Sequence, residues 1–415
     1  MNILQTTRSM DPRMGGTAEA VRLLTDALRR LDHRVEIATL DAPDAPWVQQ
    51  QHVHALGPAS GVYGYSSRFL PWLKANAQRF DAVIVNGTWQ YHSFGTWLAL
   101  RRTGVPYVIF PHGMLDVYFK QRYPLKHLKK WLYWPWSDYR VLRDAAATLF
   151  TAEQELHATR RSFWLYRANE RVVGFGIDRH PKIPSDLFFR KYPQLSDRRL
   201  LLFLGRLHPI KGLDLLLKAF ARECADPAWH LVVAGPTEGQ VFQNAQVLAR
   251  SIGISQRITW AGMVRGEEKH SLLSAAEALV LPSHHESFGI VIVEALRAGL
   301  PVLISDQVCI HREVLRHGAG LVASDTEDGT RELLRKWIAL DDHQRRSFQR
   351  ASLKCYESEF DIDQVAQRLC DILQSATAPI EFRPSGVSAP LAPSTVAATT
   401  SQTQKVNDLV TEAKD

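Results

Sequence analysis

The chain has 415 residues, of which 45% are hydrophobic and 22% charged. This composition is that of a globular protein and excludes a fibrous or wholly disordered chain. The length predicts two domains, each large enough to bury a core. The net charge of +7 fits simple solubility, or an acidic partner such as a nucleotide, an anionic membrane surface or nucleic acid.

Cysteine usage and the N-terminus both favour the cytoplasm. The four cysteines, Cys224, Cys309, Cys355 and Cys370, form no CxxC pair, so we expect buried thiols in a reducing compartment and neither a disulfide framework nor a zinc site. The first residues lack the basic and long apolar regions of a signal peptide. No apolar run approaches the roughly 18 residues of a membrane span. We therefore expect a cytoplasmic protein, which could contact the membrane from its inner face.

Short apolar runs that alternate with helical patterns predict the fold. The runs interpreted as buried strands are Ile3–Gln5, Ala82–Val85, Tyr107–Phe110, Ala147–Phe150, Leu200–Leu204, His230–Ala234, Ala278–Leu281 and Val302–Ser305. Between them lie helical patterns, such as Val21, Leu24, Leu28 and Leu31 on one face. Nearly continuous apolar strands indicate a parallel sheet covered on both faces. The sequence therefore predicts doubly wound α/β domains.

Composition also predicts the domain boundaries. A stretch with two prolines and no clear period indicates a linker at 179–197. It would join a Rossmann-like N-terminal domain, 1–178, to a Rossmann-like C-terminal domain, 198–377. Residues 378–415 are rich in Pro, Ala, Ser and Thr, which predicts a disordered tail. Ligands of such sheets bind beyond the carboxyl ends of the strands, so we expect the site in the cleft between the domains.

A glycine and two cations follow the strand that ends at Leu204. Gly205 lets a phosphate approach the backbone. Arg206 offers a planar fork of donors and Lys211 a compact charge, a combination suited to a diphosphate. Taken alone, the pair is also compatible with two solvated surface cations. The loop is not a Walker A motif, because GxxxxGK[ST] is absent.

Two acids flank a predicted helix start in the second domain. The helix would open near Phe288, Gly289 and Ile290, and helix N-termini bind anions. Glu286 lies in the preceding loop, and Glu294 lies inside an otherwise apolar helix. A solvated pair of acids is the alternative. Because carboxylates are rarely buried without a partner, a polar ligand such as sugar or ribose hydroxyls is the simpler explanation for Glu294.

The first domain offers two further candidates. The paired Gly15 and Gly16 follow the first strand and would let the backbone approach a ligand, although a tight turn explains them equally well. His112 follows a predicted strand and would face the cleft. A lone histidine is, however, more often a satisfied structural residue.

Cations and tryptophans are mixed between Lys120 and Trp136. They include Lys126, Lys129, Lys130, Trp131 and Trp134. Such a mixture suits an anionic membrane interface. A surface helix whose aromatic side chains pack inward is an equal alternative. Nucleic acid is not expected as a partner, because no recognisable nucleic-acid motif accompanies the segment.

Together these segments resemble the large retaining family of glycosyltransferases with the GT-B fold, called family 4 or the group 1 transferases. The matching strings are Gly205-Arg206 with Lys211-Gly212, the E-x7-E pattern of Glu286 and Glu294 with Phe288-Gly289, the strings around Gly262 and Gly299, and the N-terminal Gly15-Gly16 and His112-Gly113. The string that begins at Pro111 also resembles a bacterial subgroup that builds exopolysaccharides.

The resemblance implies roles for these residues. Arg206 and Lys211 would bind the donor diphosphate. Glu294 would hold the ribose hydroxyls, and Glu286 the transferred sugar. His112 would contact the donor sugar or help to orient the acceptor.

Backbone groups complete the implied donor site. Gly16 would approach the diphosphate from across the cleft, and the amides near Gly289 would meet phosphate or sugar. The nucleobase would lie near Gly262, Met263 and Val264.

Two departures and one weak motif qualify the resemblance. Ser287 stands where the family most often has glycine, and His285 precedes the first glutamate, which leaves the donor's identity open. Asp361 and Asp363 resemble a metal-binding DxD, but they open a predicted helix, where aspartate is common for capping and dipole reasons. We therefore expect no divalent metal and no cofactor besides the nucleotide-sugar substrate.

The function expected from the sequence is metal-independent, retaining transfer of a sugar from a nucleotide diphospho-sugar to a saccharide or lipid-linked acceptor, in cell-surface polysaccharide synthesis. The alternatives on this architecture are a non-catalytic partner subunit of a glycosyltransferase complex, a nucleotide-sugar epimerase and a sugar phosphorylase. The intact charged residues argue against the first, and no lysine context suggests the pyridoxal phosphate that a phosphorylase usually needs.

Overall fold

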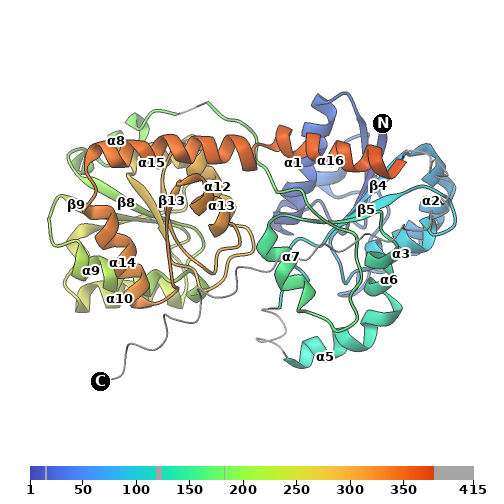
Figure 1. Cartoon of the computed structure of the whole chain (residues 1–415), viewed down its shortest axis with the longest axis horizontal. Helices are drawn as coiled ribbons and strands as arrows, with labels where there is room; N and C mark the ends of the chain where they lie inside the picture. The colour runs from blue at the N-terminus through green and yellow to red at the C-terminus, as the bar shows by residue number, and fades with distance from the viewer. Residues whose placement is uncertain (15, 118–123, 182, 378–415) are drawn as a thin grey trace, which may run out of the picture. The chain divides into compact units, whose positions relative to one another are not determined.

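Two parallel sheets form the frame of the molecule (Figure 1). The computed structural model describes residues 1–14, 16–117, 124–181 and 183–377. The predicted tail, 378–415, and the candidate Gly15 therefore lie outside the described residues. The first sheet has seven strands in the order β3-β2-β1-β4-β5-β6-β7, and the second has six in the order β10-β9-β8-β11-β12-β13. The predicted doubly wound architecture is confirmed.

The strands of the first sheet are β1 (Asn2–Thr7), β2 (Arg34–Thr39), β3 (Val53–Ala55), β4 (Ala82–Asn86), β5 (Tyr107–Phe110), β6 (Ala147–Phe150) and β7 (Glu170–Val172). Those of the second are β8 (Arg199–Leu204), β9 (Trp229–Ala234), β10 (Ile258–Gly262), β11 (Ala278–Leu281), β12 (Val302–Ser305) and β13 (Gly320–Ala323). Every residue of β4, β5, β6, β9, β11 and β12 is buried, because helices cover both faces of each sheet.

Helices connect successive strands. Around the first sheet they are α1 (Gly16–Arg30), α2 (Phe69–Asn76), α3 (Tyr91–Leu100), α5 (Pro124–Tyr133), α6 (Asp138–Asp144) and α7 (Glu153–Arg160). Around the second they are α8 (Asp186–Lys191), α9 (Leu213–Glu223), α10 (Gln240–Ser251), α11 (Gly266–Ala275), α12 (Ile290–Arg297), α13 (His311–His317), α14 (Glu327–Ile338) and α15 (Asp342–Cys355). Helix α9 packs on α10 and α14, and α15 packs on α12 and α13. The predicted helical face of Val21, Leu24 and Leu28 belongs to α1 and is buried.

The last helix, α16 (Ile362–Thr377), returns to the first sheet. It lies beside α1 (Figure 1). Arg30 on α1 forms ion pairs of 2.7 Å with Asp363 and 3.0 Å with Asp178, and His33 Nε2 lies 3.1 Å from Cys370 Sγ. Within the predicted domain 198–377, α16 is therefore a helix that packs on the other half of the chain.

The predicted linker also carries structure. Residues 179–197 connect β7 of the first sheet with β8 of the second, but they contain α8, which packs on α11. Phe188 on α8 and Leu195 after it are both buried in the core. The prolines at 181 and 184 interrupt regular structure before α8 begins, which explains why the segment lacks a clear period.

Candidate active site

A cavity of about 740 Å³ collects most of the residues that the sequence singles out, and its size is typical of a ligand pocket. Nine predicted residues line it: Gly16, His112, Gly205, Arg206, Lys211, Glu286, Phe288, Gly289 and Ile290. They follow the carboxyl ends of β1, β5, β8 and β11. In each sheet the order of the strands reverses next to the strand that comes first in the chain, which is β1 in one sheet and β8 in the other. Open parallel sheets bind their ligands at such a reversal.

Two cations form one edge of this cavity. Arg206 follows β8 and is exposed. Lys211 ends the short helix η6 (Pro209–Lys211), and its ammonium contacts the Glu286 carboxylate; the two side chains are 14% and 16% exposed. Burial and, secondarily, the Arg206 guanidinium lower the pKa of Lys211 to about 8, whereas the carboxylate contact favours the protonated amine. This edge of the cavity therefore carries fixed positive charge, part of which is paired with the Glu286 carboxylate.

Local backbone geometry places Lys211. His208 caps η6, its Nδ1 accepting from the Ile210 N–H at 3.2 Å. Gly212 ends η6 in the left-handed region, with a φ of +67°. A Cβ at this position would lie 2.2 Å from the Pro282 carbonyl oxygen. Only glycine fits both the conformation and the close approach, so Gly212 fixes the loop that carries Lys211 against the loop that leads to Glu286.

The start of α12 forms a second edge of the cavity, which also belongs to the second domain. Gly289 is its N-cap, with a φ of +80°, and a Cβ there would meet Ile292 at 2.8 Å and Glu286 at 3.0 Å. The Glu286 backbone is held by Gln307 and Cys309, through hydrogen bonds of 3.3 and 3.0 Å. The first N–H groups of a helix lack intrahelical acceptors, so the amides of Ile290 and Val291 can meet an anion in the cavity.

The first domain contributes His112 and Gly113, which turn the chain after β5. Their φ values are +50° and +72°. The left-handed conformation of a non-glycine residue costs about 1–2 kcal/mol, and surrounding contacts must hold it. The buried Glu155 carboxylate does so: it accepts from the Gly113 N–H at 2.7 Å and from the Thr151 N–H at 2.8 Å. Burial raises the pKa of Glu155.

The loops from the two sheets touch beside the cavity. A Cβ added to Gly113 would lie 3.2 Å from the Ser287 side chain. His285 Nε2 lies 3.7 Å from Asp116 Oδ2. Both departures from the family pattern, Ser287 and His285, therefore lie against the first domain, and Ser287 also lines the cavity.

Gly113 and Ser287, which the family comparison of the sequence names, also line the cavity. Sequence reasoning assigned no role to its remaining residues, which are Arg13, Met14, Thr17, Thr151, Phe175 and Val291. Arg13 adds a third cation; its side chain is 80% exposed and pairs with Asp11 at 2.8 Å. A cation just ahead of paired glycines was the available signal. Phe175 packs edge-to-face on Phe288, with ring centroids 4.6 Å apart, a contact that no local pattern indicates.

Four predicted donor-binding residues do not line this cavity. They are Gly262, Met263, Val264 and Glu294. Gly262 ends β10 and accepts from the Gly235 N–H at 2.8 Å. A polar ligand is not needed to explain the burial of Glu294, because Lys269 Nζ on α11 lies 2.6 Å from its Oε1. An ion pair thus accounts for the partly buried carboxylate.

The Trp-rich segment has features of both predicted structures, the membrane interface and the surface helix whose aromatic side chains pack inward. Lys120 lies outside the described residues. Trp134 is 1% exposed and stacks on Phe163, so it packs inward. Trp131 and Trp136 are 40% and 68% exposed.

The DxD string has a structural role. Asp361 is fully buried, lies 2.5 Å from Arg179, and accepts from the Asp363 N–H at 2.9 Å at the start of α16. In the part of the chain that the structure describes, no group of three or more His, Cys, Asp or Glu side chains is arranged to hold a metal ion.

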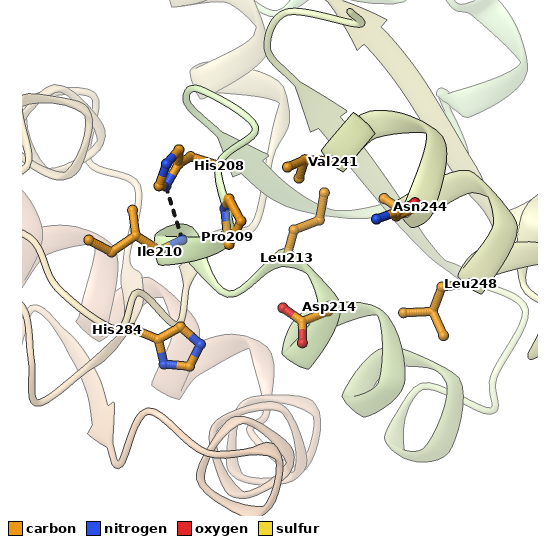
Figure 2. A pocket seen from close by; sticks show the side chains of 10 residues that line it. His208, Pro209, Ile210, Leu213, Asp214, Val241, Asn244, Leu248 and His284 are labelled. Atoms are coloured by element: carbon orange, nitrogen blue, oxygen red, sulfur yellow. Dashed lines mark hydrogen bonds between the residues drawn. The ribbon is translucent and has the colours of Figure 1, made fainter. Parts of the chain in front are cut away.

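A second cavity, of about 660 Å³, lies within the second domain (Figure 2). Pro209 and Ile210 of η6 line it together with Asp214 of α9 and Asn244 of α10. None of the predicted site residues contributes to it. Helix η6 thus borders both cavities, through Lys211 on one and Ile210 on the other.

Comparison with known proteins agrees with this geometry. The model of the glycosyl transferases group 1 matches residues 185–354, and that of the glycosyl transferase 4-like domain matches residues 15–176. A D-inositol 3-phosphate glycosyltransferase from Thermobispora bispora is 30% identical over 320 residues, 72% of this chain and 71% of the relative. The chain belongs to the group 1 glycosyltransferases.

Solved structures show the same fold. A sucrose-phosphate synthase from Thermosynechococcus elongatus superposes with a TM-score of 0.71 at 20% identity, covering 90% of this chain and 98% of that one. Anabaena HepE in complex with UDP and glucose gives a TM-score of 0.68 at 18% identity, covering 90% and 100%. The architecture is GT-B, and the protein is a transferase. Among the described residues, no helix has the length and apolar character needed to cross a bilayer.

Proposed function

We propose that this glycosyltransferase moves a hexosyl group from a nucleoside diphospho-sugar to a saccharide or lipid-linked saccharide, without a divalent cation and with retention of anomeric configuration, in cell-surface polysaccharide synthesis. The observation that carries the proposal is the 740 Å³ cavity, in which Arg206, Lys211 and the start of α12 converge. Anabaena HepE, which shares the fold, was solved with UDP and glucose. The donor-binding roles of the predicted residues belong to this proposal.

Leaving-group departure is the demanding step of glycosyl transfer, because negative charge builds on the diphosphate as the bond breaks. Arg206, Lys211 and the amides of Ile290 and Val291 are fixed positive groups that stabilise this charge, at roughly 3–4 kcal/mol for a well-placed donor. Glu286 is the acid nearest to them, and Lys211 holds it. We therefore assign Glu286 to binding of the transferred sugar, and favour front-face attack assisted by the departing phosphate.

Transfer is expected to survive removal of divalent cations, because the protein's own cations replace them. The experiment starts with a thermal-shift panel of UDP-, GDP- and ADP-sugars, since a ligand bound to the native state raises apparent stability. Donor consumption is then followed with excess EDTA, and with added Mg²⁺ or Mn²⁺. Activity that disappears with EDTA and returns with one cation contradicts metal independence. The anomeric configuration of the product tests retention. A donor sugar that is epimerised instead of transferred indicates a nucleotide-sugar epimerase.

A patch of exposed apolar side chains supports a membrane-bound acceptor. We define it by Leu125, Leu128, Trp131 and Leu132 on α5, with Trp136 and Trp164, which are 40–79% exposed. The rings of Trp131 and Trp164 lie 6.0 Å apart. Exposed cations, Lys129, Arg161 and Arg167, lie close to it in sequence. Apolar side chains beside cations suit the interface of an anionic bilayer, which is where a lipid-linked saccharide resides.

Vesicle binding is expected to depend on this patch. The full chain should co-sediment with vesicles that contain phosphatidylglycerol, less at high salt, and poorly with phosphatidylcholine alone. Leu128→Ser with Leu132→Ser should weaken binding by about tenfold or more, because two exposed leucines no longer enter the interface. Val247→Ser is the matched control, since Val247 is a 58% exposed apolar residue on α10. Equal binding by both variants contradicts docking through the patch.

A further inference from the structure

A row of buried amide groups leads from the interior of the first domain to His112. Gln5 on β1 and Asn86 at the end of β4 are both at most 2% exposed. Asn86 Nδ2 lies 3.1 Å from Gln5 Oε1, and His112 Nε2 lies 3.1 Å from Asn86 Oδ1. The three side chains thus form one relay that begins in the core and ends at the wall of the cavity.

The direction of the relay is fixed at its inner end. The Thr25 hydroxyl donates to the Val21 carbonyl at 2.7 Å. Gln5 Nε2 donates to the same carbonyl at 3.2 Å and to Thr25 Oγ1 at 2.7 Å. A backbone carbonyl accepts and never donates, so the nitrogen of the Gln5 amide must face α1. Its oxygen therefore faces Asn86.

A second backbone carbonyl fixes the next step. Asn86 Nδ2 donates to Gln5 Oε1 and also reaches the Thr6 carbonyl, at 3.4 Å. Both partners are acceptors, so the Asn86 amide cannot be reversed without two acceptor–acceptor contacts. Its Oδ1 is thereby presented to His112, and an amide oxygen can only accept. The proton of this hydrogen bond must reside on His112 Nε2.

The second ring nitrogen of His112, Nδ1, is then an unprotonated hydrogen-bond acceptor. Burial lowers the pKa of His112 to about 4, with a smaller contribution from the neighbouring His92. The imidazole is therefore neutral near pH 7, and with Nε2 protonated its Nδ1 carries a lone pair. Within the described residues, Nδ1 has no hydrogen-bond partner, and His112 lines the cavity. Stacking on Phe110, with an interplanar angle of 17°, holds the ring.

We propose that Asn86, oriented by Gln5, is a positioning residue that holds His112 as the Nε2–H tautomer, so that Nδ1 accepts a hydrogen bond from a hydroxyl of the transferred sugar. The ligand part rests on the proposed function. An acceptor-only nitrogen discriminates by chemistry: a hydroxyl can donate to it, a deoxy carbon leaves it unpaired, and a carboxylate meets it with a second acceptor. For the hydroxyl at C6, the one position at which hexosyl and uronosyl groups differ, the relay therefore selects neutral hexosyl donors over uronosyl donors.

The tautomer is directly observable in the full chain. With ¹⁵N-histidine labelling, long-range ¹H–¹⁵N correlation spectra near neutral pH distinguish a protonated from an unprotonated ring nitrogen, and His112→Asn assigns the resonances. We expect Nε2 protonated and Nδ1 unprotonated. An Nδ1–H tautomer, or an imidazolium at neutral pH, overturns the proposal whatever the enzyme's activity. The readout needs no substrate, so its failure is distinguishable from failure of the proposed function.

Variants at the relay separate positioning from simple stability. Asn86→Leu is similar in size and removes the acceptor of the Nε2 proton, so the ring of His112 should no longer be held as the Nε2–H tautomer. kcat/KM should then fall about tenfold, as for the loss of one hydrogen bond. Thr96→Val is the matched control, because Thr96 is equally buried and its hydroxyl bonds to the His92 carbonyl and the Thr6 hydroxyl, not to Gln5, Asn86 or His112. Its His112 spectrum and kcat/KM should match the wild type.

The ligand part has its own readout. A neutral nucleotide-hexose that binds in the thermal-shift panel should shift the Nδ1 resonance of the wild type, and the matching uronosyl donor should bind at least about tenfold more weakly. A bound donor that leaves Nδ1 unshifted, or an Asn86→Leu variant with an unchanged His112 spectrum and unchanged kcat/KM, overturns the inference. If no nucleotide-sugar binds at all while the tautomer is as expected, the proposed function fails and the assignment of a sugar to Nδ1 fails with it.

Discussion

Arg206→Ala is expected to lower kcat about 10²–10³-fold, the effect of removing one charge-stabilising donor from a transition state, while the fold stays intact. Arg206 is exposed and lies in a loop after β8, so its removal opens no cavity in the core. Steady-state kinetics with the donor identified by the panel provide the measurement. Binding of the nucleoside diphosphate should weaken in parallel, whereas binding of the free nucleoside should not change.

The controls for this prediction separate charge from geometry. Arg206→Lys keeps the charge but loses the planar fork, so it should recover only part of the activity. Arg250→Ala removes an exposed arginine from α10 in the same domain and should leave kcat unchanged. Wild-type turnover by Arg206→Ala would contradict the assignment of the diphosphate to this edge of the cavity.

Lys211 requires a different design, because it holds Glu286. Lys211→Ala should lower kcat to a similar extent, but it also leaves the Glu286 carboxylate, 16% exposed, without its cation. Glu286→Gln keeps the shape of the side chain and removes the charge. If Lys211 acts on the diphosphate, the Lys211→Ala, Glu286→Gln double variant stays as slow as Lys211→Ala. Recovery in the double variant would mean that Lys211 serves only to neutralise Glu286.

The strands that sequence reasoning found and missed differ in position. The eight predicted strands are all interior strands of the two sheets, and each is a nearly continuous apolar run. The missed strands are the edge strands β3, β7, β10 and β13, together with β2 beside an edge. An edge strand has a neighbour on one side only and tolerates polar residues. In β7, for example, Arg171 and Val172 are exposed. An unbroken run of apolar residues indicates a segment that is buried on both faces. Such runs therefore reveal only the strands that are completely buried.

The site divides in the same way. Cavity residues next to a strand or helix that the sequence pattern reveals were predictable: Arg206 and Lys211 follow a strand, and Phe288 precedes a helix. Residues whose environment depends on distant segments were not. Glu294 is paired by Lys269 on another helix, and Glu155 holds Gly113 from a helix after the next strand. Such partners are brought together by the order of the strands, which no local pattern contains.

Gly212→Ala is expected to damage both stability and activity, by about 2–5 kcal/mol in the free energy of unfolding. The left-handed φ of +67° contributes about 1–2 kcal/mol for a residue with a Cβ. The rest comes from overlap, because that Cβ would lie 2.2 Å from the Pro282 carbonyl oxygen and the two loops must separate. Since one loop carries Lys211 and the other leads to Glu286, kcat should fall as well. Thermal denaturation and steady-state kinetics provide the measurements.

Gly253→Ala isolates the conformational part of this effect. Gly253 has a φ of +75°, and nothing lies within 4 Å of an added Cβ. This variant should lose only about 1–2 kcal/mol and retain its kcat. If the two alanine variants are equally stable and equally active, close approach at Pro282 does not position Lys211, and the cationic edge must be set by the Glu286 contact alone. A larger loss in Gly212→Ala, in stability and in turnover together, ties the charge of the edge to a backbone contact that only glycine permits.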